Sequence, residues 1–236
     1  MQHYTIADLS VCYDAAYPTL QTRSVKYASP PEKIVSPLSA TAAEIEKMRD
    51  DTPLLDDDLR EYMIMGRKFY ELLIEHDGMM LHASAVVVDD RAYLFSAPSG
   101  TGKSTHTALW LKQFGARAYI LNDDKPAIRV TDGTAYAFGT PFSGKYDLSE
   151  NRRVPIAGIA FIERSETNTI DVMPQKRAIF ELLNQTVRPR STDLYARLLH
   201  NLDAILRCTP VYTLRCNMQD EAALVSYETM RKGSIV

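Results

Sequence analysis

The sequence has 236 residues, and its 45% hydrophobic and 24% charged content is typical of a globular protein, which excludes a low-complexity or collagen-like chain. Its 27 Lys and Arg against 30 Asp and Glu leave a formal net charge of −3, and this balance argues against wholesale binding of nucleic acid. The longest apolar runs are far shorter than a membrane span, so no membrane contact is expected.

The cysteines and the first residues indicate a reducing compartment. Cys12, Cys208 and Cys216 stand at unrelated spacings without a CxxC pair, which disfavours zinc and dithiol sites and predicts inert thiols. The chain starts without a basic segment followed by an apolar one, so no secretory signal is expected. A cytoplasmic location is therefore predicted.

Residues 1–58 are predicted to form a small β-rich extension of the main domain, residues 59–236, in one compact unit. Four prolines within residues 1–40 favour short strands and loops rather than helices. The acid-rich stretch 50–58 predicts a solvated helix start, with a metal cluster as the less favoured alternative. Apolar residues at helical spacing then predict a helix over residues 59–73, ended by residues 76–78.

The next segment predicts a hairpin that leads into a glycine-rich loop. Residues 79–88 have the composition of a buried strand, residues 89–91 form a polar turn, and residues 92–97 have the pattern of a second strand. After the loop, residues 106–114 predict a helix that ends at Gly115. Its expected apolar face consists of Ala108, Leu109, Leu111 and Phe114. Trp110, on the same helix, is predicted to lie in the core rather than to stack on a base.

The rest of the chain alternates strand and helix patterns without an internal repeat or a flexible linker. Strands are predicted at residues 118–121, 127–130, 135–138, 156–162 and 211–214, and helices at residues 177–186, 192–206 and 220–232. This order predicts an α/β domain with a small N-terminal β-rich part.

The loop between the second hairpin strand and the helix has the pattern of a phosphate-binding loop. It reads Ser99-Gly100-Thr101-Gly102-Lys103-Ser104-Thr105, with Ala97 where the strict pattern has glycine. The glycines allow several backbone N–H groups to converge on phosphate oxygens at a helix N-terminus. Lys103 is expected to contact the β- and γ-phosphates of a nucleotide, and Ser104 to offer its hydroxyl to Mg²⁺. A glycine-rich turn without a ligand is the alternative.

Two adjacent carboxylates, Asp123 and Asp124, follow the next predicted strand. Because one helix and one strand separate them from Lys103, a crossover connection is expected to return them beside the loop. There, Asp123 is predicted to hold Mg²⁺ and Asp124 to orient or deprotonate an attacking hydroxyl. An exposed turn is the alternative for this pair.

Basic residues beyond the acid pair are candidates for stabilising the transferred phosphoryl group. Lys145, in a glycine-containing loop, is the preferred one. Arg152 and Arg153 fit a surface or substrate-binding role equally well, and Arg188 and Arg190 fit a solvated loop better than an anion site.

The ordered set of motifs resembles the catalytic domain of HPr kinase/phosphorylase and its smaller relatives. The set is Leu81-His82-Ala83-Ser84-Ala85, the loop at residues 97–104, Asp123-Asp124, and a segment at residues 139–145. The resemblance covers roughly residues 60–215. It implies a phosphate-loop domain of the fold shared with ATP-dependent phosphoenolpyruvate carboxykinase, with a mixed sheet and flanking helices. It also implies that His82 lines the active site with the acid pair.

The sequence thus predicts an ATP- and Mg²⁺-dependent kinase that phosphorylates a hydroxyl of a protein, a peptide or a small molecule. Its catalytic residues are predicted to be His82, Lys103, Asp124 and Lys145. The family often forms oligomers, so the resemblance is compatible with a homo-oligomer, but the sequence leaves the oligomeric state open. The alternatives are a non-catalytic ATP-binding regulatory module, a carboxykinase acting on oxaloacetate, and a small-molecule kinase of the nucleoside or shikimate type.

Overall fold

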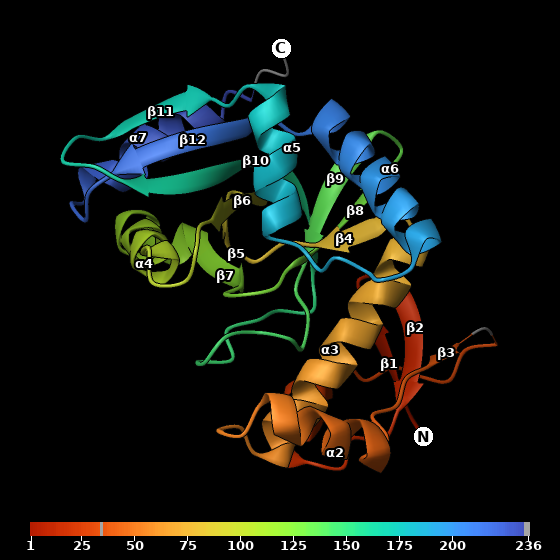
Figure 1. Ribbon diagram of the computed structural model, residues 1–236. Coiled ribbons are helices and arrows are strands. Elements are labelled where there is room, and N and C mark those ends of the chain that lie inside the picture. The colour runs from red at the N-terminus through yellow and green to blue at the C-terminus, as the bar shows by residue number, and fades with distance from the viewer. Residues whose placement is uncertain (34, 234–236) are drawn as a thin grey trace.

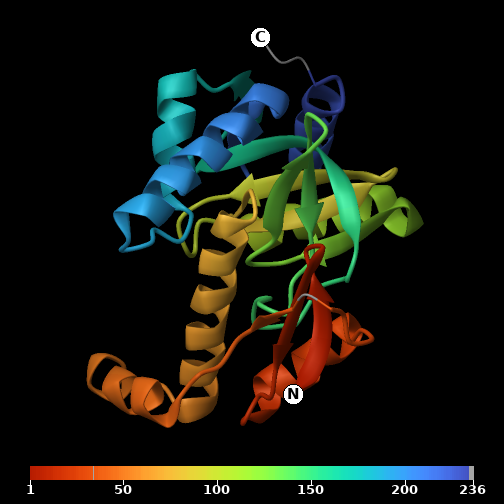
Figure 2. The same ribbon diagram turned by 90° about the vertical axis from the view of Figure 1, so that its right-hand side faces the viewer.

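The structure is a computed structural model that describes residues 1–33 and 35–233. It is a mixed α/β fold in which a curled mixed sheet carries helices on both faces, and a smaller sheet lies beside the long helix α3 (Figures 1 and 2). Among the described residues, no helix combines the length and the apolar character that a bilayer crossing needs.

The strands belong to two sheets. The small sheet has the order β1 (Gln2–Ile6), β2 (Leu9–Tyr13), β3 (Ser36–Pro37). The large sheet has the order β4 (Gly78–Met80), β8 (Ala127–Thr131), β9 (Thr134–Phe138), β10 (Arg153–Arg164), β6 (Arg91–Ser96), β5 (Ala83–Val88), β7 (Ala118–Asn122), and β12 (Val211–Cys216) pairs with both β10 and β11 (Thr169–Val172).

Seven α-helices surround these sheets in the described chain. They are α1 (Pro18–Ser24), α2 (Ala42–Asp51), α3 (Asp57–Glu75), α4 (Lys103–Phe114), α5 (Gln175–Asn184), α6 (Thr192–Cys208) and α7 (Glu221–Met230). Short 3-10 turns follow α1 (Val25–Tyr27) and α4 (Gly115–Arg117).

Alternation of side chains along the central strands gives the large sheet two apolar faces. On β5, Ala85 and Val87 pack with residues of α5 and α6, whereas Val86 and Val88 pack with Trp110 of α4 and with α7. Both faces are buried, so these strands have the continuous apolar composition that the sequence shows.

The order of the central strands brings the chain back to one edge of the sheet. β6 and β7 both pair antiparallel with β5, and they are therefore parallel to each other. The connection from β6 to β7 contains the glycine-rich loop and α4. As predicted, the loop and the acid pair follow parallel strands of one sheet.

The N-terminal region is richer in helix than predicted. Residues 18–24 form α1, whose first residue is Pro18, a position where the missing N–H of proline costs nothing. Asp50 and Asp51 end α2 instead of starting a helix, whereas Asp56 caps α3 by accepting the Leu59 N–H at 2.9 Å. The small sheet, α1 and α3 share one apolar cluster.

One further prediction about local structure was wrong, and another holds only in part. The strand predicted over residues 79–88 is broken at Leu81 and His82, between β4 and β5. Of the predicted apolar face of α4, Leu109, Leu111 and Phe114 are partly buried and pack against the core, whereas Ala108 is exposed. The fully buried residues of α4 are His106, Thr107 and Trp110. The pattern of apolar residues did not predict the burial of His106 and Thr107, because these polar side chains are buried with hydrogen-bond partners. The other predicted strands and helices are confirmed within a few residues at their ends, and the core position of Trp110 is confirmed.

Candidate active site

The glycine-rich loop leaves β6 and enters α4 with two residues in the left-handed backbone region. Gly100 has φ 76° and Gly102, the N-cap of α4, has φ 124°. A Cβ added at either position would meet no atom within 4 Å outside its immediate chain neighbours, so backbone conformation rather than space requires glycine there. The loop therefore places backbone N–H groups at the positive end of a 12-residue helix.

Lys103 reaches back across this loop. Its Nζ donates to the carbonyl oxygen of Ala97 at 2.9 Å. Burial lowers the pKa of Lys103, and the nearby carboxylate of Asp124 acts in the opposite direction. This hydrogen bond places the ammonium group beside Ala97, at the start of the loop.

Arg164, the last residue of β10, holds the loop from the other side. Its guanidinium donates to the carbonyl oxygens of Gly100 at 2.5 Å and Thr101 at 3.2 Å. Sequence reasoning missed this residue. The only signal was its position just after the predicted strand 156–162, but the pairing of β10 with β6 was needed to place it beside the loop.

The buried Asn122 shapes the turn that carries the acid pair. Its Oδ1 accepts the backbone N–H groups of Asp124 at 3.0 Å and Lys125 at 2.7 Å, and its Nδ2 donates to the Thr140 carbonyl at 3.1 Å. This arrangement is an Asx turn with an additional anchor on the neighbouring loop. Asn122 was not among the predicted site residues.

Asp123 contacts the loop that contains Lys145. Its Oδ1 accepts the Gly144 N–H at 2.6 Å, and a Cβ on Gly144 would lie 2.9 Å from its Oδ2. Burial raises the pKa of Asp123, the Gly144 N–H opposes this, and the charge of Asp124 adds to it. The close backbone approach fixes one carboxylate oxygen and leaves the other available for a cation.

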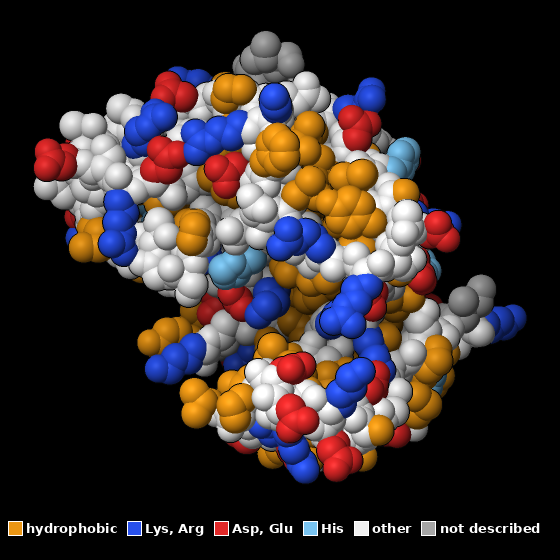
Figure 3. Space-filling view, viewed as in Figure 1, with side chains coloured by type: hydrophobic (Ala, Val, Ile, Leu, Met, Phe, Trp, Pro, Cys, Tyr) orange, Lys and Arg blue, Asp and Glu red, His pale blue; other side chains and the backbone are white. Residues whose placement is uncertain are grey.

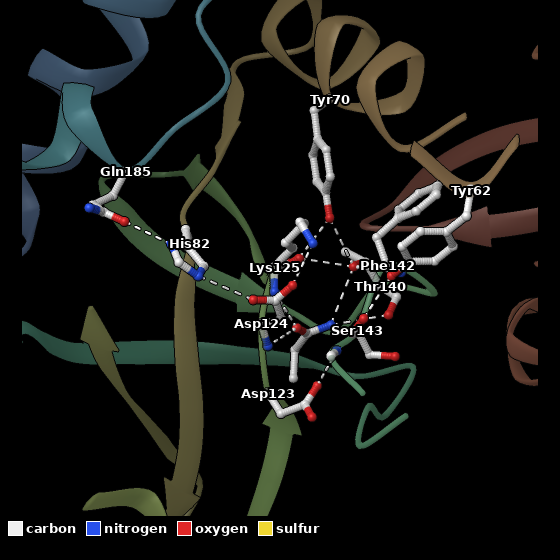
Figure 4. Close-up of polar contacts among 12 residues, drawn as sticks. Tyr62, Tyr70, His82, Asp123, Asp124, Lys125, Thr140, Phe142, Ser143 and Gln185 are labelled. Atoms are coloured by element: carbon white, nitrogen blue, oxygen red, sulfur yellow. Dashed lines mark hydrogen bonds and ion pairs between the residues drawn. The ribbon is translucent and has the colours of Figure 1, made fainter. Parts of the chain in front are cut away.

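Asp124 lies between two basic side chains, His82 and Lys125 (Figure 4). His82 Nε2 is 3.3 Å from Asp124 Oδ1, and the Lys125 ammonium binds Oδ2. Burial alone would raise the pKa of Asp124, but the contacts with His82 and Lys125 outweigh it and lower the pKa to about 2. Asp124 is therefore ionised at neutral pH.

Gln185 positions His82 by two contacts, of which Figure 4 shows the one between the side chains. The His82 backbone N–H donates to the Gln185 carbonyl at 2.7 Å, and His82 Nδ1 donates to Gln185 Oε1 at 2.8 Å. These contacts explain why the strand breaks at His82: its N–H bonds to the residue after α5 instead of to a strand. Gln185 was not predicted, since no local pattern marks it.

The loop, His82 and the two aspartates line one cleft with a volume of about 360 Å³. The cleft is lined by His82, Ser99, Gly100, Gly102, Lys103, Ser104, Thr105, Asp123, Asp124, Gly144, Lys145 and Tyr146. Of the predicted site residues, the lining omits Thr101, which lies within the same loop. Figure 3 shows a hollow between the part that carries α2 and the part that carries α5, with acidic, basic and histidine side chains at its edge.

The other basic candidates lie elsewhere. The Arg153 guanidinium is 3.3 Å from an Asp8 carboxylate oxygen, and Arg152 lies over the ring of Tyr119. Arg188 and Arg190 line a different cleft of about 710 Å³, beside α2 and α3. Lys145 is exposed at the rim of the site cleft.

The donor set fits a magnesium ion held jointly with phosphate. Within residues 1–33 and 35–233, no group of three or more His, Cys, Asp or Glu side chains gathers in a way that could hold a metal, and this includes the acidic stretch 50–58. Mg²⁺, however, is commonly held by one or two protein oxygens together with substrate phosphates. Asp123 and Ser104, both on the cleft, are oxygen donors of this kind.

Comparisons with known proteins do not assign a family. No protein-family model matches the chain, and no curated protein matches it. A solved structure similar to this chain is the Hpr(Ser) kinase/phosphatase from Coxiella burnetii, with 11% identity and a TM-score of 0.36 over 65% of this chain and 88% of that chain. A likeness at this level shows neither a family nor an activity, so the resemblance drawn from the motifs stays a prediction.

Proposed function

We propose that the protein is an ATP-dependent kinase that transfers the γ-phosphate to a hydroxyl group with Mg²⁺. The observation that carries this proposal is the single cleft shared by the loop at residues 99–105, His82, both aspartates and Lys145. Phosphoryl transfer needs an anion cradle, a metal-binding oxygen and a group that orients the nucleophile. This cleft contains a candidate for each.

The loop and Lys103 would bind the phosphates. Backbone N–H groups at the start of α4 and the Lys103 ammonium are the donors available to the β- and γ-phosphate oxygens. Asp123 and Ser104 would hold Mg²⁺, which when bound neutralises charge on the phosphate oxygens. Lys145, at the rim, would offer further positive charge to the transferred group.

Asp124 would orient the acceptor hydroxyl. With a pKa of about 2 it is an ionised hydrogen-bond acceptor at neutral pH, but not a strong base. A loose transition state demands little deprotonation of the nucleophile before bond formation, so orientation is the main task. His82 and Lys125 would keep Asp124 ionised and directed at the cleft.

The test is incubation with γ-labelled ATP and Mg²⁺ in the presence of candidate proteins, peptides and hydroxyl-bearing small molecules. The proposal expects label on an acceptor with wild-type protein, and strongly reduced labelling with Lys103→Met or Asp124→Asn. Nucleotide binding without transfer to any acceptor would instead favour a regulatory module. Formation of phosphoenolpyruvate from oxaloacetate would favour a carboxykinase.

A further inference from the structure

A second cleft, of about 450 Å³, begins at the same loop. It shares Gly100, Gly102 and Thr105 with the first cleft and continues to residues at the ends of β10 and β12. β10 is parallel to both β6 and β12, so the cleft lies at the carboxyl ends of three parallel strands. Ligands of open α/β sheets bind characteristically at this edge.

The walls of the second cleft suit a flat ring with apolar faces. Leu109 of α4 and Ile162 of β10 line it, and Met218 stands at its mouth with 76% of its surface exposed. Exposed methionine is adaptable and polarisable, and it packs well against aromatic rings. Asn217 and Ser165 add polar groups. Apolar walls with a few polar groups are the usual composition of a small-molecule site.

The buried ring of His106 is a further polar group on this cleft. The indole Nε1 of Trp110, which can only donate, lies 3.1 Å from both His106 Nε2 and Ser226 Oγ, and Ser226 Oγ is 3.2 Å from His106 Nε2. Burial lowers the pKa of His106 to about 4, so the ring is neutral, with one donor and one acceptor nitrogen. Among the described residues, Nδ1 contacts the Cys216 sulfur at 3.9 Å, which is a weak hydrogen-bond partner.

We infer that this second cleft holds the base of the nucleotide, with Leu109, Ile162 and Met218 against its faces and the polar residues His106, Ser165 and Asn217 at its edge. The inference rests on the proposed function, because it assumes that the triphosphate lies on the loop that both clefts share. The nucleotide then spans the loop: its base lies in the cleft of Leu109 and its γ-phosphate in the cleft of Asp124.

The test compares ATP with inorganic tripolyphosphate, which has the same phosphate chain but no base. Leu109→Trp would fill the second cleft, and Ala108→Trp is the matched control because Ala108 is exposed on the adjacent position of α4. Calorimetric titration with Mg²⁺ should show Leu109→Trp weakening ATP at least about tenfold while tripolyphosphate affinity stays within about twofold. Ala108→Trp should leave both affinities unchanged.

The outcomes separate the two proposals. Unchanged ATP affinity in Leu109→Trp would overturn the base site while leaving the kinase proposal in place. Failure of wild-type protein to bind either ligand would overturn both. If Leu109→Trp loses both ligands, photolabelling of wild-type protein with 8-azido-ATP decides: label within residues 105–109 or 215–218 supports the base site, and label confined to other residues overturns it.

Discussion

Replacing Asp124 with asparagine tests the central polar contacts of the site. The lowering of the Asp124 pKa from 3.8 to about 2 corresponds to about 2 kcal/mol of favourable interaction with its surroundings. Because an acid with a depressed pKa stabilises the fold above its unfolded pKa, this contribution is present at neutral pH and disappears as the pH falls toward 2. Asparagine keeps the shape but leaves His82 and Lys125 without the charge they contact.

We therefore expect Asp124→Asn to lower the free energy of unfolding by about 2 kcal/mol in urea titrations at neutral pH, and turnover to fall by roughly 10²- to 10⁴-fold. Nucleotide affinity should change by less than about tenfold, since the phosphates contact the loop. Asp132→Asn, in the exposed turn between β8 and β9, is the control and should change none of these. Wild-type turnover in Asp124→Asn would refute the orienting role.

Four further changes test other parts of the account. Lys103→Met should weaken the affinity for ATP by roughly 10- to 100-fold in calorimetric titration, since it removes one charge-assisted contact; unchanged affinity would contradict phosphate binding by this loop. Gln185→Leu should reduce turnover about tenfold, and Gln185→Glu, which keeps an acceptor for His82 Nδ1, should restore most of it; equal loss in both would contradict positioning. Burial raises the pKa of Asp123, so acidification should protonate it, and should weaken Mg²⁺-dependent nucleotide binding, at a higher pH than for an aspartate with an ordinary pKa. Asp123→Asn should abolish this pH dependence of the nucleotide affinity. Gly139→Ala drives a Cβ into the backbone oxygen of Glu150 and should cost about 3 kcal/mol or more in urea unfolding; a neutral effect would contradict the packing of that loop.

The parts of the fold that depend on local patterns were predictable. The β5–β6 hairpin, the loop into α4 and the helix α3 all follow from short-range periodicity and turn residues. The buried face of α4 was not predictable in this way. His106 and Thr107 are buried because Ser226 of α7 and Ser84 of β5 supply hydrogen-bond partners, and those partners are distant in sequence.

The residues of the candidate site also differ in whether local sequence patterns or contacts between distant residues reveal them. The residues of the loop and the acid pair have recognisable spacing, and the structure gathers them in one cleft. Gln185, Arg164 and Asn122 act by holding other groups in place, and each does so across strand pairings or turns that a single sequence does not reveal. The break of the strand at His82 was unpredictable for the same reason, because a contact with the sequence-distant Gln185 causes it.

Titration of the protein with a non-hydrolysable ATP analogue, with and without Mg²⁺, tests the central claim most directly. The account predicts one saturable site whose affinity rises with Mg²⁺ in wild-type protein but not in Asp123→Asn. Absence of binding, or binding that Mg²⁺ leaves unchanged in the wild-type protein, would contradict it.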